Sequence, residues 1–290
     1  MLQIWARLLG AALMAGVTFA LPFGSHSHEA PHGQPQQGWC AFGEYSLNSW
    51  EDLGVLERAK LEPSVDYGAT INIPVNVFIL GDSATQSRLN LSSPVVRLQD
   101  NLAYGYSSLG YSFGPFNTYH VYDSKLAQFS YGPRISDELL KIARHLRSGG
   151  AETLNIYLVP KMTTGVLGFS LFPHILMRNT PDALAIDGVL FSYYTMTHYL
   201  AEKTTIHEVG HWLGLVHPFQ GGCLVPDGDG VPDTPQAEFK NDQQCVAEKD
   251  TCPGLPGIDL VRNYMMYSSM FADILSQLED APVLAAVSKP

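Results

Sequence analysis

One histidine-rich stretch constrains this chain more than any other feature of its sequence. Residues 204–219 read TTIHEVGHWLGLVHPF and contain three of the ten histidines. His207 and His211 are four residues apart, so on a helix both side chains project from one face and can bind the same metal ion. Gly214 allows the helix to end in a sharp turn, after which His217 can reach the same ion. Three histidines leave a fourth coordination position for water, which is typical of a catalytic zinc site.

The residue after the first histidine indicates which chemistry the site performs. Glu208 cannot point in the same direction as both His207 and His211, but its carboxylate can reach a water molecule held at the metal. Apolar residues in this stretch are also compatible with an ordinary amphipathic helix. Five fixed identities at fixed spacing favour the zinc site, with Glu208 as the general base.

A second motif follows about fifty residues downstream. The pattern His-Glu-x-x-His-x-x-Gly-x-x-His followed by a methionine turn is the metzincin signature, and residues 262–269 read RNYMMYSS. From residue 71 to residue 269 the chain resembles the pappalysin-type metzincins, in particular the secreted fungal metalloproteases and their prokaryotic, ulilysin-like relatives. The phrases that carry the resemblance are GGAETLNIYLVP, DGVLFSYY, HEVGHWLGLVHPFQGGC, GDGVPDTP and NYMMYS.

The resemblance implies a function and roles for further residues. It implies a zinc-dependent endopeptidase that acts on proteins or peptides through a zinc-activated water molecule, with Glu208 as the base. Met265 would form the apolar floor beneath the zinc ligands, and Tyr267 would offer its hydroxyl to the zinc site or the transition state. We expect the substrate to lie extended beside an edge strand, for which residues 166–172 are the candidate.

The first twenty residues indicate where the protein acts. Arg7 is followed by an apolar run from residue 8 to Ala20, with small residues at Thr18 and Ala20, which is typical of a secretory signal peptide. The run is too short to span a membrane. We therefore expect a secreted, extracellular protein with a signal peptide at 1–20. Residues 21–64 are expected to be a low-complexity leader or a pro-segment, and residues 65–290 the metalloprotease catalytic domain.

Overall charge excludes some classes of partner. The formal net charge of −11 argues against binding to nucleic acid, which requires a basic patch, and equally against an anionic membrane surface. A hydrophobic fraction of 46% is enough to fill a sizeable core. We expect a monomer.

Hydrophobic patterning predicts an α/β (α+β) fold. Residues 71–80 alternate as a strand, although Pro74 weakens this segment as a central strand. Helices are expected at 92–109 and from Ser136 to Gly150, and further strands at 153–160, 165–173 and 187–196. Together these segments predict a mixed twisted sheet with helices in the N-terminal half, followed by the active-site helix. After Gly221 the sequence predicts an irregular, loop-rich C-terminal half.

Four cysteines are expected to lie in an oxidising compartment. Cys40, Cys223, Cys245 and Cys252 allow three complete pairings, and the sequence does not choose among them. The family resemblance implies a disulfide between Cys223 and Cys252. Cys245 is then free or paired with Cys40, and a third alternative has Cys40 capping the zinc ion in a latent form, since a thiolate is a good zinc ligand.

Two surface features complete the expected sites. Asp227, Asp229, Asp233 and Thr234 form an oxygen-rich loop that suits calcium, and calcium is known near this segment in the resembling family; the alternative is a solvated acidic turn. Asn90 begins the Asn-Leu-Ser triplet of a glycosylation site.

Departures from the family pattern leave two alternatives to the protease. Met266 stands where the family usually has Asp, and the tail after Tyr267 does not resemble the family's closing helix. The first alternative is a catalytically impaired secreted zinc-binding protein. The second is a zinc amidase with a non-peptide substrate. Retention of Glu208 favours the protease, because a purely structural zinc site has no need of a base.

Overall fold

The computed structural model describes residues 39–42, 70–88, 92–128, 131, 137–162, 166–178, 182–197, 201–224, 228–231, 234–240, 246 and 248–267. The predicted signal peptide and the sites at Asn90 and Cys245 lie outside these residues. Within the described part of the chain, no helix is long and apolar enough to cross a membrane.

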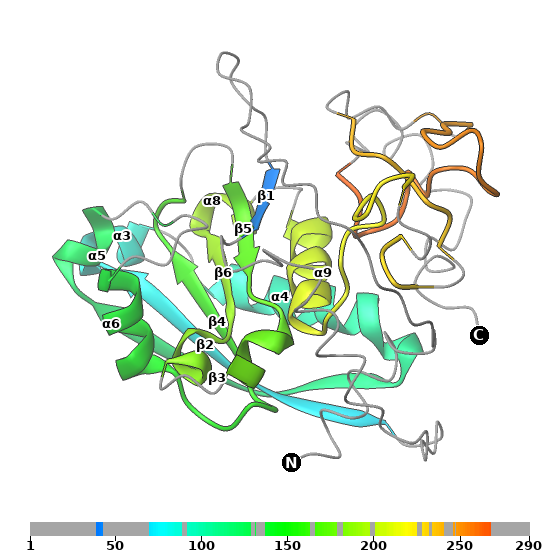
Figure 1. Ribbon diagram of the computed structural model, residues 1–290. Coiled ribbons are helices and arrows are strands. Elements are labelled where there is room, and N and C mark those ends of the chain that lie inside the picture. Colours follow the sequence, from blue (N-terminus) through cyan, green and yellow to red (C-terminus); the bar gives the residue numbers. More distant parts are fainter. Residues whose placement is uncertain are drawn as a thin grey trace.

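A six-stranded sheet forms the centre of the N-terminal half (Figure 1). Its order is β1-β5-β6-β4-β2-β3, and every neighbouring pair is parallel except β5 and β6. The strands are β1 (Trp39–Phe42), β2 (Ile71–Gly81), β3 (Tyr111–Tyr122), β4 (Leu154–Val159), β5 (Val166–Ser170) and β6 (Val189–Ser192).

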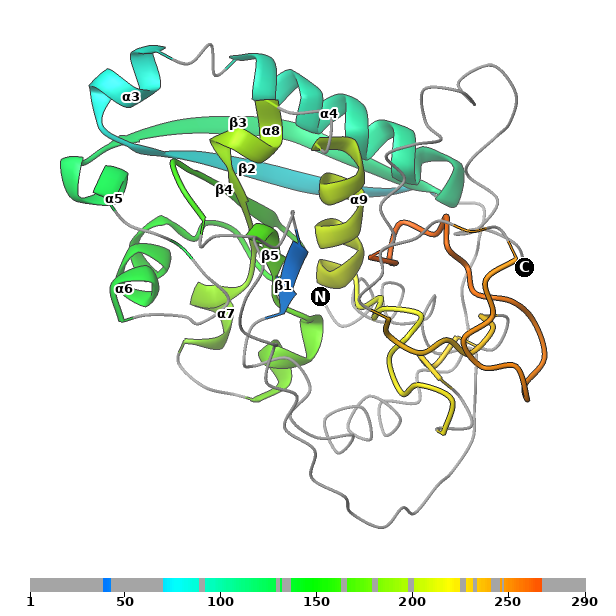
Figure 2. The ribbon, with the colours of Figure 1, turned by 90° about the horizontal axis from the view of Figure 1, so that it is seen from above.

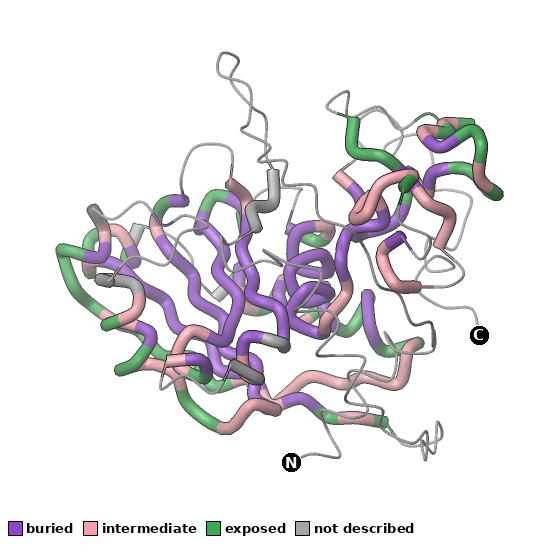
Figure 3. The backbone as a smooth tube through the Cα atoms, in the orientation of Figure 1, coloured by how far each residue is buried: buried purple, intermediate pink, exposed green. Residues whose placement is uncertain are grey.

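Both faces of the sheet are covered, as the alternation along β2 requires. Ile73, Val75, Val77 and Ile79 share one core with side chains of α4 (Ser92–Tyr106) and α9 (Ala201–Trp212). Phe78 and Leu80 project to the opposite face and pack in a second core with Leu126 of α5 (Ser124–Gln128), against which α6 (Asp137–Leu146) also packs. Figure 2 shows α4 and α9 on one side of the strands and α5 and α6 on the other. Strands β2, β4 and β6 between them are buried along most of their length, whereas the edge strand β3 has no buried residue (Figure 3).

The expectation that Pro74 weakens β2 as a central strand was wrong. β2 pairs with β3 on one side and with β4 on the other. The β2–β3 register shifts between Ile73 and Val75, and pairing with β4 begins only at Val75. Pro74 therefore sits where the ladder is already interrupted, so its missing N–H costs no regular hydrogen bond.

The strand expected at 187–196 is shorter than predicted. It ends at Ser192, and residues Tyr193–Thr197 form α8. The Ser192 hydroxyl oxygen accepts a hydrogen bond of 3.0 Å from the Thr195 N–H, which is the interaction that starts a helix. The remaining short elements are α3 (Ser83–Arg88), α7 (Ala183–Ile186) and the 3-10 helices η1 (Ser107–Leu109) and η2 (Pro173–Arg178).

Beyond Trp212 the character of the chain changes as the sequence predicted. The described residues that follow it contain turns but no helix or strand. In Figure 1 these loops lie together on the side of α9 away from the sheet. The predicted class is therefore confirmed: a mixed sheet with helices, an active-site helix and a loop-rich C-terminal half.

Candidate active site

Helix α9 carries the first two histidines of the motif in the interior of the protein. His207, Glu208 and His211 are all buried. The helix lies close to α4: a Cβ atom built on Gly105 of α4 would come within 2.7 Å of the Ile206 side chain. Only a glycine therefore fits at this contact unless Ile206 shifts. The Tyr106 hydroxyl adds a 2.6 Å hydrogen bond to the Ile206 carbonyl oxygen. These contacts fix the position of the helix from which the site is built.

Gly214 brings the third histidine to the first two, as predicted. Its φ of 103° lies in the left-handed region, which glycine adopts without strain. The Gly214 N–H bonds to the His211 carbonyl oxygen and the Leu215 N–H to the Gly210 carbonyl oxygen, both at 2.9 Å. This pair of bonds is a Schellman cap, and it reverses the chain so that His217 returns toward α9.

All three imidazole rings converge through the same ring atom. The Nε2 atoms of His211 and His217 lie 2.9 Å and 3.1 Å from Nε2 of His207, and the three candidate ligand atoms lie within 4.8 Å of one another. Zinc–nitrogen bonds of about 2.0–2.1 Å in a tetrahedral site separate the nitrogens by roughly 3.3 Å. The three rings thus fit one zinc ion.

The hydrogen bonds of Nδ1 in two of the rings show why the converging Nε2 atoms need a cation between them. Nδ1 of His207 lies 2.7 Å from the Tyr264 carbonyl oxygen, and Nδ1 of His211 lies 2.7 Å from the Leu215 carbonyl oxygen. A carbonyl oxygen only accepts, so each Nδ1 carries the proton and each neutral ring presents a lone pair at Nε2. Two lone pairs at such a short distance repel each other unless a cation lies between them.

Burial keeps the three rings neutral. It lowers the pKa of His211 to about 4 and the pKa values of His207 and His217 well below the usual 6.5. The neighbouring histidines act in the same direction on His207 and His217, because a second positive charge in the cluster is unfavourable. Neutral imidazole is the form that binds a metal ion.

Strand β5 places the Glu208 side chain. A Cβ atom built on Gly168 of β5 would come within 2.7 Å of Glu208 Cγ and 3.0 Å of Glu208 Oε1. The glutamate side chain therefore lies directly against the backbone of the antiparallel strand. Its carboxylate is on the α9 face that adjoins β5, beside the histidines.

The methionine turn lies beneath α9. A Cβ atom on Gly210 would be 2.6 Å from Met265 Sδ, so the buried Met265 packs against the helix between the two helical histidines. Tyr264 ties the same turn to the first turn of α9 through a 2.9 Å hydrogen bond from its hydroxyl to Glu202. The Tyr267 ring lies 4.4 Å from that of His217 and 5.7 Å from that of His207.

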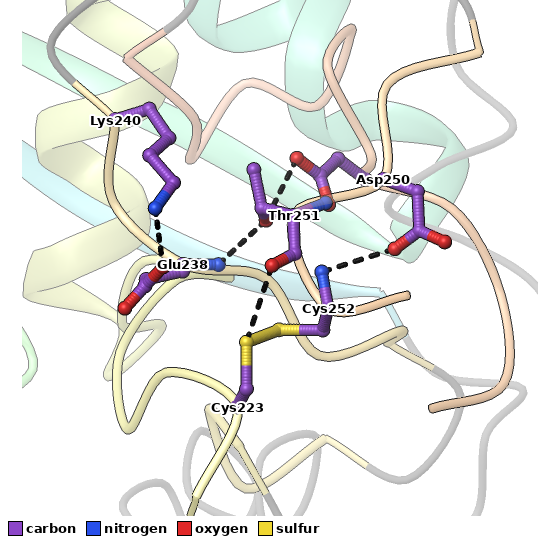
Figure 4. Close-up of a disulfide and its surroundings, with 7 residues drawn as sticks. Cys223, Glu238, Lys240, Asp250, Thr251 and Cys252 are labelled. Carbon is purple, nitrogen blue, oxygen red and sulfur yellow. Dashed lines mark hydrogen bonds and ion pairs between the residues drawn. A yellow bond between two sulfur atoms is a disulfide. The ribbon is translucent and has the colours of Figure 1, made fainter. Parts of the chain in front are cut away.

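The predicted disulfide joins Cys223 to Cys252 (Figure 4). Of the oxygen-rich loop predicted for calcium, Asp227 and Asp233 lie outside the described residues. Asp229 accepts a hydrogen bond of 3.0 Å from the Val231 N–H, and the Thr234 N–H bonds to the Val231 carbonyl oxygen at 3.0 Å. These bonds define a local turn, and calcium at this loop stays a prediction.

The edge expected to receive substrate pairs with a segment that the sequence did not predict as a strand. Trp39, Ala41 and Phe42 of β1 pair in parallel with Val166, Phe169 and Ser170 of β5. Cys40 therefore belongs to a strand beside the site. The predicted pairing of Cys40 with Cys245 or with zinc concerns side chains outside the described residues.

Sequence reasoning missed a buried charged group that supports α9. Asp187 accepts a 2.8 Å hydrogen bond from the Trp212 indole N–H and forms a 2.8 Å ion pair with Arg147. Trp212 directly follows His211, so this bond holds the C-terminal end of the helix. No local signal marks Asp187, because its partners are 25 and 40 residues away in the chain.

Comparison with known proteins agrees with this geometry. Residues 144–278 match the model of the peptidase M43 family, described as pregnancy-associated plasma protein-A. An extracellular metalloprotease of Verticillium alfalfae is 34% identical over 252 residues, which is 84% of this chain and 81% of that protein. One from Podospora anserina is 30% identical over 270 residues, covering 90% of this chain and 88% of its own.

Mature mirolysin of Tannerella forsythia, in complex with a cleaved peptide, is 22% identical with a TM-score of 0.46, over 68% of this chain and 83% of mirolysin.

The mixed sheet, the helix with its returning histidine and the methionine turn define a metalloprotease of the metzincin class. Within that class, the extent of the match to the fungal enzymes places the chain in one family. The chain belongs to the pappalysin-type metalloproteases, peptidase family M43.

Proposed function

We propose that this protein is a secreted zinc-dependent endopeptidase in which Glu208 is the general base. The convergence of three neutral imidazole Nε2 atoms beside a buried glutamate carries the proposal. His207, His211 and His217 would hold the ion. Zinc in such a site polarises a carbonyl oxygen as a Lewis acid and lowers the pKa of water.

Glu208 performs the proton transfers of the proposed reaction. Its carboxylate accepts a proton from the attacking water and delivers it to the leaving amine nitrogen. The contact with Gly168 supports this role, because it holds the carboxylate toward the strand beside which an extended peptide would lie. The substrate main chain then bonds to β5 and its scissile carbonyl faces the histidines.

Tyr267 assists at the developing oxyanion. Its ring contacts the rings of His207 and His217, so the hydroxyl is carried by a side chain packed on the ligand set. A donor positioned where negative charge develops stabilises the transition state more than the bound substrate.

The leader at 21–64 is the pro-segment of the enzyme in this proposal. Its β1 strand pairs with β5, along the same backbone edge that a substrate needs. Removal of the leader would free the edge. N-terminal sequencing of the active secreted protein tests this: a mature end after β1 supports it, whereas full activity with residues 39–42 still attached contradicts it.

The function is tested by incubating the secreted protein with a diverse peptide library and reading the cuts by mass spectrometry. We expect cleavage that a zinc chelator abolishes and that falls by about 10²–10⁴-fold in Glu208→Gln. The matched control is bound zinc, which should remain at one ion per chain in the variant, because Glu208 is not a ligand.

The same experiment separates the alternatives. Folded, zinc-loaded protein that cuts no peptide, with or without its leader, would support the catalytically impaired zinc-binding protein suggested by Met266 and the divergent tail. Activity on small amides alone would favour the amidase.

A further inference from the structure

Three aromatic side chains extend outward from the third histidine; we call Phe219, Phe239 and Tyr267 the aromatic cluster. The Phe219 ring stacks on His217 with 4.6 Å between centroids. Phe239 lies 5.2 Å from Phe219 and 6.1 Å from Tyr267, and Phe219 lies 5.2 Å from Tyr267. The cluster is thus a continuous apolar path that begins at a proposed zinc ligand.

Exposure increases along this path. His217 is buried, Phe219 and Tyr267 are half-buried, and Phe239 is 42% exposed. The outermost ring therefore presents apolar surface to solvent while its other side rests on the site. Removing the exposed apolar surface of this ring from water would be favourable, so contact with an apolar group of a ligand is favourable.

The position of Phe239 is fixed by its neighbours in the loop-rich half. The Glu238 N–H donates a 2.7 Å hydrogen bond to the Thr251 hydroxyl oxygen, and that hydroxyl donates to the buried Asp259 carboxylate at 2.9 Å. Thr251 is next to Cys252 of the disulfide, as Figure 4 shows. Backbone anchoring of this kind preorganises the ring and reduces the entropy lost on binding.

Charge around the ring favours an apolar ligand over a charged one. The two residues that flank Phe239, Glu238 and Lys240, form an ion pair with each other. Their opposite charges offset each other, so the two residues that flank the ring carry no net charge together. The path from the His217 ring to the Phe239 ring passes through Phe219, with centroid distances of 4.6 Å and 5.2 Å. An extended peptide advances roughly 3.3 Å per residue, so at most about three residues cover this path.

From these observations we infer that Phe239 determines specificity: its ring contacts a large apolar side chain of the substrate, within three residues of the scissile bond. The inference rests on the proposed endopeptidase function and adds a substrate class to it. Peptides with Phe or Leu at the contacted position are cut faster than otherwise identical peptides with Ala there.

Kinetics with matched variants test the inference. In the secreted protein, intact and after limited trypsin treatment, we expect Phe239→Ala to reduce the Phe-over-Ala preference in kcat/KM by about ten-fold. The change should be mainly a higher KM for the Phe peptide, and Phe239→Leu should retain part of the Phe-over-Ala preference. Tyr122→Ala is the control, because Tyr122 is 62% exposed on β3 at the opposite end of the sheet from β5. An unchanged preference, or an equal loss for both peptides, would overturn the inference.

A binding measurement keeps this test independent of turnover. Two peptide hydroxamates that differ only in a benzyl or a methyl side chain are titrated by calorimetry into Glu208→Gln, with and without Phe239→Ala. A benzyl preference that falls about ten-fold with Phe239→Ala supports the inference even if no peptide is cut, and then only the endopeptidase proposal fails. If peptides are cut but the preference does not depend on Phe239, the endopeptidase proposal stands and the inference about Phe239 fails. Absence of binding to either hydroxamate also overturns the inference.

Discussion

At the scale of single residues, the space available to Glu208 matters as much as its chemistry. Gly168 leaves no room beyond a hydrogen atom, because an added Cβ would meet Glu208 Cγ at 2.7 Å and Thr204 Cγ2 at 3.0 Å. Cγ is close to the backbone and cannot swing away as the end of a long side chain can. The glycine thus sets the direction of the carboxylate.

We therefore expect Gly168→Ala to impair the enzyme while keeping every proposed catalytic group. A shift of Glu208 by a fraction of an ångström to 1 Å should lower kcat/KM on a peptide substrate by about 100-fold. The tighter packing should lower the free energy of unfolding by about 1–3 kcal/mol. Bound zinc, measured by atomic absorption, should stay at one ion per chain.

Gly254→Ala is the control for this change, because a Cβ atom there would meet nothing within 4 Å. It should leave both activity and stability near the wild-type values. Wild-type activity in Gly168→Ala would show that β5 does not orient the base.

The sequence predicted the candidate zinc ligands but not two other residues on which our predictions rest, Gly168 and Phe239. His207, His211 and Gly214 follow from helix geometry, which relates residues three and four apart. Gly168 and Phe239 act through neighbours that approach from distant parts of the chain. Only the folded arrangement of strand, helix and loop brings them to the site.

At the scale of elements, one buried ion pair links three of them. Arg147 follows the end of α6, Asp187 precedes β6, and Trp212 ends α9. The side chains of Arg147 and Asp187 are only 4% and 0% exposed. Burial raises the pKa of Asp187 to about 6, against the opposing effects of the Arg147 charge and the hydrogen bonds from Arg147 and Trp212. The pair thus holds the active-site helix at a cost in desolvation.

Arg147→Met should lower the free energy of unfolding in a way that depends on pH. At pH 7 it removes the cation beside the buried Asp187 carboxyl, which must then stay charged and unpaired or take up a proton, and we expect a loss of about 3–5 kcal/mol in the free energy of unfolding. The pKa of Asp187 in the folded state lies above its unfolded value and rises further without Arg147. Protonation below about pH 6 therefore favours the folded state, so the deficit relative to wild type should shrink from pH 7 to pH 5.

Urea unfolding at the two pH values measures this difference. Arg144→Met serves as the control, since Arg144 and Asp182 form an ion pair at the exposed surface, where screening leaves little stabilisation. Its effect should be small at both pH values. A deficit in Arg147→Met that does not change with pH would show that Asp187 does not titrate in this range.

Element boundaries depended on interactions that a periodic pattern does not contain. The alternation in β2 was sufficient to predict the strand, but the bulge that accommodates Pro74 depends on the register with β3. The Ser192–Thr195 bond turned part of an expected strand into α8. Strand β3 was not predicted because Gly114 and Pro115 interrupt its pattern, yet β2 pairs along nearly its whole length.

At the scale of the whole molecule, two halves of different construction meet at α9. The N-terminal half has a sheet with two cores. The described loops of the other half have no regular secondary structure and depend on specific cross-links, among them the Cys223–Cys252 disulfide and the bonds of Thr251 to Asp259. Because Phe239 and Tyr267 belong to this second half, the roles proposed for them require its order, even though the helix with two of the candidate zinc ligands belongs to the first.

Removing the disulfide should therefore loosen one half more than the other. The bond spans 29 residues, for which the chain-entropy model gives about 3–4 kcal/mol of stabilisation. In Cys223→Ser/Cys252→Ser we expect hydrogen exchange to lose protection at residues 248–267 while β2, at the centre of the sheet, keeps it. The Phe-over-Ala preference should fall as in Phe239→Ala, since the anchor of that ring is next to Cys252. Equal loss of protection in β2 and in 248–267 would contradict this division and indicate that the molecule unfolds as one cooperative unit.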